Sequence, residues 1–162
     1  MKATVLVAED DEADVFLLRR AFKSAEMEAP VEFVPDGQAA IEFLQRQSQA
    51  TDDLLPSLII LDLKMPRKTG LEALQWLREQ PVLGKIPAVI FSSSDRREDV
   101  ERAYALGANA YLLKPPSIAE RIEVARFVKD WIRLCKAPLA TAEGFRAARS
   151  AHLANSADPA GL

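Results

Sequence analysis

The stretch Leu58-Ile59-Ile60-Leu61-Asp62 decides the fold of this chain. Its four apolar residues follow Pro56 and are too few for a buried helix, so they predict a short strand covered on both faces. Strands of this kind occupy the centre of parallel sheets that carry helices on both sides. The stretch therefore predicts an α/β protein with the carboxylate of Asp62 at the carboxyl end of its central strand.

Four further apolar runs predict strands at residues 4–8, 31–34, 88–91 and 110–113. Segments with helical periodicity separate them, at about residues 12–25, 37–44, 70–80, 98–106 and 118–136, and the polar residues 45–53 are predicted to be a helix end and a loop. This alternation predicts a doubly wound, five-stranded parallel sheet over residues 1–137. Residues 138–162 are predicted to be a tail, partly helical or disordered, that is too short for an output domain.

The composition is that of a soluble globular chain, with 162 residues, 49% hydrophobic residues and a net charge of −3. Proteins that bind nucleic acid usually present a basic face, so no nucleic-acid partner is expected. The apolar run near the N-terminus is too short for a signal peptide or a membrane span. The single cysteine, Cys135, fits a reducing compartment, and the expected location is the cytoplasm.

Residues with useful chemistry follow four of the predicted strands: Glu9 and Asp10, Asp62, Ser92, and Lys114. In sheets of this type, ligands bind beyond the carboxyl ends of the strands. Carboxylates that share one edge raise one another's pKa unless a cation lies between them, and an all-oxygen set suits Mg²⁺. Lys114 and Ser92 can both donate to phosphoryl oxygens. These residue types together predict a phosphoryl-transfer site with a carboxylate nucleophile.

The same residues resemble the receiver domains of two-component response regulators. The resemblance runs from about Thr4 to Cys135, and it is carried by Val7-Ala8-Glu9-Asp10-Asp11, Leu61-Asp62-Leu63-Lys64-Met65-Pro66, Gly70, Phe91-Ser92-Ser93, Gly107-Ala108 and Tyr111-Leu112-Leu113-Lys114-Pro115. It implies a flavodoxin-like sheet with the strand order 2-1-3-4-5. It also implies a phosphoacceptor switch rather than an enzyme, which takes a phosphoryl group from a sensor histidine kinase and loses it slowly.

The resemblance implies a metal site around the phosphoryl acceptor. Asp62 is implied to be the phosphorylated aspartate and a ligand to Mg²⁺. Asp10 is implied to bind the ion directly, Glu9 largely through water, and Lys64 through its backbone carbonyl. The side chain of Lys64 is a departure, because relatives often have Asn there. Its cation lies two residues from the nucleophile and therefore bears on the rate of dephosphorylation.

The resemblance also implies a switch at the neighbouring strand ends. Ser92 would move toward the phosphoryl group, and the rotamer of Tyr111 would follow that movement. Lys114 would pair with the phosphoryl oxygens, next to a cis Lys114–Pro115 bond. Plainer interpretations are a turn serine, a core aromatic and a solvated lysine. Asp11 is interpreted as a helix N-cap instead of a ligand.

Within the family, the chain is similar to the small single-domain regulators that are paired with phytochrome-type and other hybrid histidine kinases. This finer resemblance is carried by the loop Lys64-Met65-Pro66-Arg67-Lys68-Thr69-Gly70, the polar stretch before Pro56 and the long, Trp-bearing last helix. It implies a sensor histidine kinase as the partner, either of the phytochrome type or of another hybrid type.

The last predicted helix has two apolar stripes, although a helix on a sheet needs only one. One contains Ile118, Ile122, Ala125, Val128, Ile132 and Cys135, and the other contains Val124, Phe127, Trp131 and Leu134. Large aromatic residues dominate the energetics of interfaces, so Phe127 and Trp131 predict a homodimer face. A wide core stripe, or a tail folded over it, is the alternative.

Two other functions compete with the phosphoacceptor switch. Phosphohydrolases of the haloacid-dehalogenase type also use an aspartate after a strand, but they need a second acid two residues later, where this chain has Lys64. A receiver-shaped interaction module that takes no phosphate would not require acids, a hydroxyl and a lysine at the strand ends. All of these are present, which favours the switch.

Overall fold

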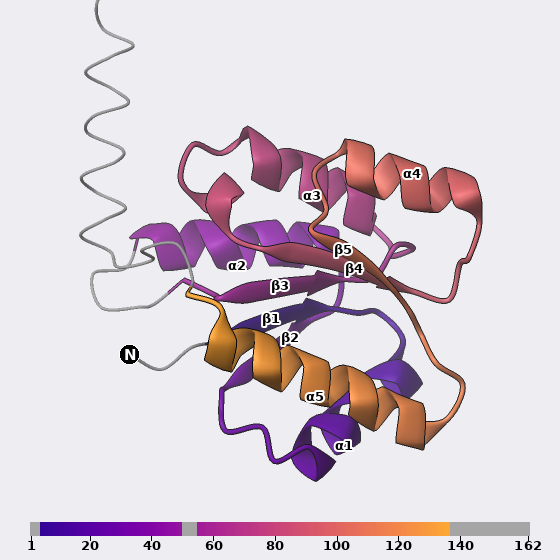
Figure 1. Cartoon of the computed structure of the whole chain (residues 1–162). Coiled ribbons are helices and arrows are strands. Elements are labelled where there is room, and N and C mark those ends of the chain that lie inside the picture. Colours follow the sequence, from indigo (N-terminus) through magenta and orange to yellow (C-terminus); the bar gives the residue numbers. More distant parts are fainter. Residues whose placement is uncertain (1–3, 50–54, 137–162) are drawn as a thin grey trace, which may run out of the picture.

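The computed structural model describes residues 4–49 and 55–136, which form a parallel sheet between two layers of helices (Figure 1). The strands are β1 (Val5–Ala8), β2 (Val31–Val34), β3 (Leu58–Leu61), β4 (Ala88–Ser92) and β5 (Ala110–Leu113). Their spatial order is β2-β1-β3-β4-β5, and each neighbouring pair is parallel. The predicted fold class and strand order are confirmed, with β3 at the centre.

The helices of the described residues are α1 (Glu12–Ser24), α2 (Gly37–Gln49), α3 (Gly70–Glu79), α4 (Arg97–Ala105), α5 (Ile118–Leu134) and the short 3₁₀ helix η1 (Leu83–Lys85). Figure 1 shows α2, α3 and α4 on one face of the sheet and α1 and α5 on the other. Within residues 4–49 and 55–136, no helix is both long and apolar enough to cross a membrane.

Two apolar clusters hold the layers together, one on each face of the sheet. Ile59 and Leu61 of β3 belong to the cluster under α2, α3 and α4, whereas Leu58 and Ile60 belong to the cluster under α1 and α5. All four side chains are at most 3% exposed. Because both faces of β3 are covered, its sequence is apolar at every position. Burial of β3 fixes Asp62 at the rim of the sheet.

Helix α2 ends at Gln49, within the residues 45–53 that the sequence predicts to be a helix end and a loop. The part of this range after Gln49 lies outside the described residues. The last turn of α2 contains several glutamines, which are good helix formers, and its polarity reflects its partial exposure to solvent. The tail predicted at residues 138–162 lies outside the described residues.

The loop between β3 and α3 is anchored to neighbouring elements. Thr69 caps the start of α3 in a capping box. Arg67 donates to Asp36 at 2.7 Å, and the other oxygen of Asp36 accepts from the backbone N–H of Ala39. Burial acts to raise the pKa of Asp36, but Arg67 and the backbone donors outweigh it and lower the pKa. The loop that begins after β3 is therefore tied to the first turn of α2.

Candidate functional site

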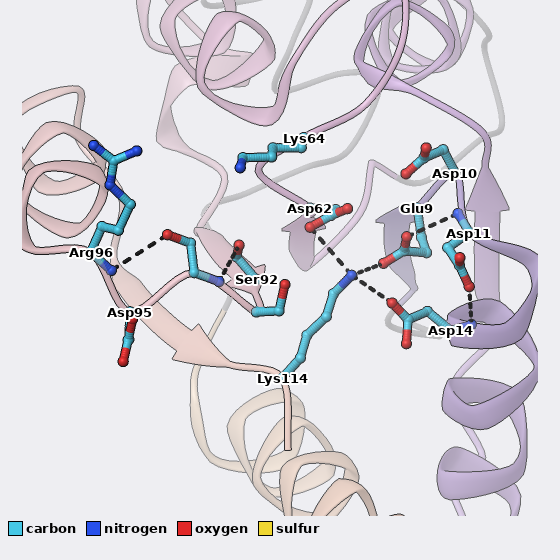
Figure 2. Close-up of a pocket in the computed structure, with 12 residues that line it drawn as sticks. Glu9, Asp10, Asp11, Asp14, Asp62, Lys64, Ser92, Asp95, Arg96 and Lys114 are labelled. Atoms are coloured by element: carbon cyan, nitrogen blue, oxygen red, sulfur yellow. Dashed lines mark hydrogen bonds and ion pairs between the residues drawn. The ribbon is translucent and has the colours of Figure 1, made fainter. Parts of the chain in front are cut away.

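The carboxyl ends of β1, β3, β4 and β5 meet around an open pocket of about 530 Å³ (Figure 2). The pocket contains all the residues predicted at these strand ends, and Lys64 lines it with an exposed side chain. The lining residues are Glu9, Asp10, Asp11, Asp14, Asp62, Lys64, Ser92, Ser93, Ser94, Asp95, Arg96 and Lys114. The role of the Lys64 carbonyl as a metal ligand stays a prediction.

Glu9, Asp10 and Asp62 form the acidic centre of the pocket. One carboxylate oxygen from each residue lies within 4.8 Å of the other two. Glu9 and Asp62 are buried, whereas Asp10 is exposed. Burial raises the pKa of Glu9 and of Asp62 above the ordinary values, and Lys114 offsets only part of the rise. This crowded, converging, all-oxygen donor set fits a hard divalent cation.

Lys114 places its ammonium group among three carboxylates (Figure 2). Its Nζ atom lies 2.6 Å from Glu9 Oε2, 2.8 Å from Asp14 Oδ2 and 3.3 Å from Asp62 Oδ1. The side chain is 7% exposed, so the alternative of a solvated lysine is wrong. Burial acts to lower the pKa of Lys114, but Asp14 and Glu9 outweigh it and raise the pKa. The ammonium therefore stays charged.

Two charged residues that the sequence did not assign to the site are linked to Lys114 by ion pairs. Asp14 on α1 contacts Lys114 through one carboxylate oxygen and Arg121 on α5 through the other, at 2.8 Å each. Arg121 is only 6% exposed. Burial acts to raise the pKa of Asp14, but its two cationic partners outweigh it and lower the pKa. The site therefore extends inward from the strand ends to α1 and α5.

Ser92 and Tyr111 contact the same residue of the loop between β4 and α4. The hydroxyl of Ser92, the last residue of β4, accepts from the backbone N–H of Ser94 at 3.1 Å. The hydroxyl of Tyr111 donates to the carbonyl oxygen of Ser94 at 2.8 Å. Movement of Ser92 would therefore disturb the same loop that Tyr111 holds. The predicted coupling of the two movements stays a prediction.

The predicted cis bond between Lys114 and Pro115 is wrong, because no peptide bond in residues 4–49 and 55–136 is cis. The trans form of a bond before proline is favoured by about 0.5–1 kcal/mol. In this loop, the N–H of Lys114 donates to the Ser92 carbonyl at 2.8 Å, and the Pro115 carbonyl accepts from Arg121 Nε at 3.0 Å. These contacts hold the backbone on both sides of the trans bond.

Asp11 accepts from the N–H of the residue three positions later, which confirms it as an N-cap.

The two aromatic residues predicted for a dimer face differ in exposure. Phe127 is 41% exposed, whereas Trp131 is half-buried against the cluster under α1 and α5. Their ring centroids are 5.9 Å apart. Tyr104 on α4 and Leu113 on β5 are also exposed. Exposed apolar side chains therefore occur on α4, β5 and α5, while Trp131 partly fits the alternative of a wide core stripe.

Comparisons with known proteins point to one family. Residues 5–126 match the response regulator receiver domain. Response regulator Rcp1 of Synechocystis is 31% identical over 137 residues, which cover 84% of this chain and 93% of that protein. The solved structure of the phosphorylated cyanobacterial phytochrome response regulator RcpA has a TM-score of 0.76 and 27% identity, over 85% of this chain and 99% of that one. The structure of Mn²⁺-bound Rcp1 has a TM-score of 0.73 and 31% identity, and the match covers 84% of this chain and 99% of that one.

Receiver domains act as phosphoacceptor switches and not as conventional enzymes, and phosphorylation by a histidine kinase is typical of them. The family match covers most of the chain, and the related regulators match it along nearly their whole length. This chain belongs to the response regulator receiver family and is related to the phytochrome response regulators.

Proposed function

We propose that this chain receives a phosphoryl group on Asp62 from a sensor histidine kinase, with Mg²⁺ bound beside the acceptor. One observation carries the proposal. The carboxylate of Asp62 is clustered with Glu9 and Asp10, and its Oδ1 atom lies 3.3 Å from the buried ammonium of Lys114. A carboxylate nucleophile, an oxygen-rich cation site and a fixed positive charge are the groups that phosphoryl transfer requires.

In the proposed reaction, a carboxylate oxygen of Asp62 attacks the phosphorus atom of a phosphohistidine. The new O–P bond forms as the P–N bond breaks, and the imidazole nitrogen keeps the electron pair. Oδ1 of Asp62 accepts from the N–H of Leu63 at 2.8 Å and faces Lys114, so we assign Oδ2 as the attacking atom. Lys114 and Ser92 would donate to the phosphoryl oxygens, where charge is concentrated. Slow hydrolysis of the acyl phosphate would return the switch to its resting state.

Incubation of the chain with a small acyl phosphate and Mg²⁺, followed by intact-mass measurement, tests this function. We expect the mass to rise by one phosphoryl group. A phosphorylated histidine kinase should serve as a faster donor, because its docking orients the phosphohistidine toward Asp62. A chain whose mass stays unchanged with both donors would overturn the proposal.

We assign the Mg²⁺ site to Asp10, Asp62, the backbone carbonyl of Lys64 and, largely through water, Glu9. When bound, the ion supplies positive charge that offsets the repulsion between these carboxylates and the phosphoryl oxygens. The closely spaced oxygen donors support this assignment, and a relative has been solved in an Mn²⁺-bound form. The preference for Mg²⁺ rests on the hard carboxylate and carbonyl donors.

Asp10→Asn is expected to remove most of the stabilisation that Mg²⁺ gives to the folded chain. Binding of the ion to the native state alone raises the melting temperature by linkage, and loss of one negative ligand weakens that binding. Thermal unfolding with and without Mg²⁺ measures the shift. Asp95→Asn is the matched control, because Asp95 lines the pocket but is not a member of the acidic cluster. A full Mg²⁺ shift in Asp10→Asn would place the ion elsewhere.

We further propose a phytochrome-type histidine kinase as the partner class, with both proteins meeting in the cytoplasm. RcpA, which is named as a phytochrome response regulator, matches 85% of this chain, which supports a kinase of the same class. The net charge of −3 gives no reason to expect a nucleic-acid partner. A panel of phosphorylated kinases would rank the partners by transfer rate, and a phytochrome-type kinase that transfers no faster than an unrelated one would contradict the assignment.

We also propose that α4, β5 and α5 form a homodimer face. The exposed Tyr104, Leu113 and Phe127 lie on these three elements, and β5 is an edge strand of the sheet. Tyr111 links β5 to the loop before α4 through its bond to Ser94, so this face is connected to the pocket. Phosphorylation could therefore change the same surface that a second copy contacts.

Phe127→Asp is expected to weaken the dimer by roughly 2 kcal/mol, which is about 30-fold in Kd, if Phe127 is an anchor of the face. Sedimentation with and without phosphodonor measures the association. Phe16→Asp is the matched control, because Phe16 is also an exposed phenylalanine but lies on α1. A wild-type chain that stays monomeric at high concentration in both states would contradict the dimer.

A further inference from the structure

We propose that Asp14 and Arg121 are positioning residues for Lys114: Asp14 holds the Lys114 ammonium back from Asp62 and competes with the phosphoryl group for it, and Arg121 limits this competition by pairing with the other oxygen of Asp14. The inference rests on the proposed function, because it concerns the lysine that would stabilise the phosphoryl oxygens. It follows from contacts between α1 and two consecutive elements about 100 positions later in the sequence, the end of β5 and α5.

The contacts around Lys114 form a closed ring. Lys114 Nζ contacts Asp14 Oδ2 at 2.8 Å, and Asp14 Oδ1 contacts Arg121 Nη2 at 2.8 Å. Arg121 Nε then donates to the carbonyl of Pro115 at 3.0 Å, and Pro115 is the residue that follows Lys114. Arg121 therefore restrains both the tip of Lys114, through Asp14, and the backbone from which Lys114 extends.

The distances show which carboxylates hold the ammonium. Lys114 Nζ donates hydrogen bonds to Glu9 at 2.6 Å and Asp14 at 2.8 Å, whereas Asp62 lies farther away at 3.3 Å. An ammonium group has three donors, and two are committed to acids other than the acceptor. A phosphoryl group on Asp62 must draw Lys114 toward it against these two contacts. Of the two acids, Asp14 belongs neither to the acceptor nor to the acidic cluster.

The burial of Arg121 is difficult to explain without Asp14. Arg121 falls on the core-facing side of α5, where Ala125 and Val128 are fully buried. Its Nη1 atom has no hydrogen-bond partner within the described part of the chain. A buried charge costs free energy unless it is paired, and a leucine at this position would carry no such desolvation cost. The ion pair with Asp14 therefore offsets the cost of burying the Arg121 guanidinium, and it connects Arg121 to the partner of Lys114.

Asp14→Asn should release Lys114 toward the phosphoryl site. The amide keeps the shape of the side chain and an oxygen acceptor, but it removes the charge that competes for the ammonium. We expect Asp62 to be phosphorylated faster by a small acyl phosphate, by about fivefold, the lower end of usual couplings between linked groups. Fluoroberyllate, which imitates the phosphoryl group, should bind more tightly by a similar factor.

Two controls separate positioning from a general effect of charge. Asp130→Asn makes the same substitution in an exposed Asp–Arg pair on α5 and should leave both measurements unchanged. In a Lys114→Met background, Asp14→Asn should no longer increase the rate, because the competition requires the lysine. An equal gain without Lys114, or a rate that is unchanged or slower in Asp14→Asn alone, would overturn the inference.

Arg121→Gln is a second variant, and its expected effect on phosphorylation and on fluoroberyllate binding is opposite to that of Asp14→Asn. Without the guanidinium, the full charge of Asp14 acts on Lys114, so fluoroberyllate should bind more weakly and phosphorylation should slow. In an Asp14→Asn background, Arg121→Gln should have no such effect, and an effect that persists there would contradict the role of Arg121 as a partner of Asp14.

If the wild-type chain accepts no phosphoryl group at all, the proposed function fails and this inference fails with it. A phosphorylated wild type with unresponsive variants overturns the inference alone.

Discussion

Asp62→Asn is expected to abolish phosphorylation, so that a variant incubated with a small acyl phosphate and Mg²⁺ keeps its original mass. The amide has nearly the same shape as the carboxylate, but its oxygen is a poor nucleophile and cannot form a stable acyl phosphate. Among the carboxylates that line the pocket, Asp62 is the one that follows the central strand. Glu9 is also buried, but Lys114 engages one of its oxygens at 2.6 Å and the N–H of Asp11 engages the other at 3.0 Å. The loss should therefore be complete and not partial.

The same substitution separates a chemical role from a structural one. Burial raises the pKa of Asp62, which means that its charged form is favoured less in the folded chain than in the unfolded chain. At neutral pH and without a divalent cation, Asp62→Asn should therefore unfold at a higher temperature than the wild type. Asp95→Asn, in the same pocket, should keep the wild-type mass gain. A phosphoryl group found on the Asp62→Asn chain would refute the assignment of the acceptor.

The strand-end residues were predictable from the sequence because of the geometry of parallel sheets. Short apolar runs can be placed without knowledge of tertiary contacts, and the carboxyl ends of parallel strands meet at one edge. Asp62 and Lys114, which are 52 positions apart in the numbering, could therefore be placed together. The exact residue at which α2 ends could not be predicted in this way, because the polar residues from Gln45 onward suit both a solvent-facing helix turn and a loop.

Asp14 and Arg121 were missed for a different reason. Asp14 stands in a run of acids near the start of α1, where a helix-terminus role is sufficient to explain it. Arg121, however, comes three residues after Ile118 and four before Ala125, on the stripe predicted to be buried. A charge at a buried position requires a partner, so the sequence contained a signal that an acid must face it. Which acid it would be depends on the packing of α1 against α5.

Gly70→Ala is expected to destabilise the chain and to slow phosphorylation at the same time. A Cβ atom at Gly70 would lie 1.9 Å from the backbone carbonyl oxygen of Asp62, a contact that no atom can tolerate. Because the obstacle is backbone, either α3 or the loop after β3 must shift. Such overpacking costs about 1–3 kcal/mol, and each kcal/mol lowers the melting temperature of a chain of this size by about 2–4 °C.

The effect of Gly70→Ala on the reaction follows from the same contact. One of the two segments that can shift is the loop that carries Asp62 and the carbonyl of Lys64, and a displacement of about 1 Å can reduce a rate by 100-fold. Gly84→Ala is the matched control, since a Cβ atom there would lie 3.0 Å from the nearest atom and far from the pocket. We expect Gly84→Ala to be phosphorylated at the wild-type rate. A Gly70→Ala chain with wild-type melting temperature and rate would show that the start of α3 does not position the acceptor.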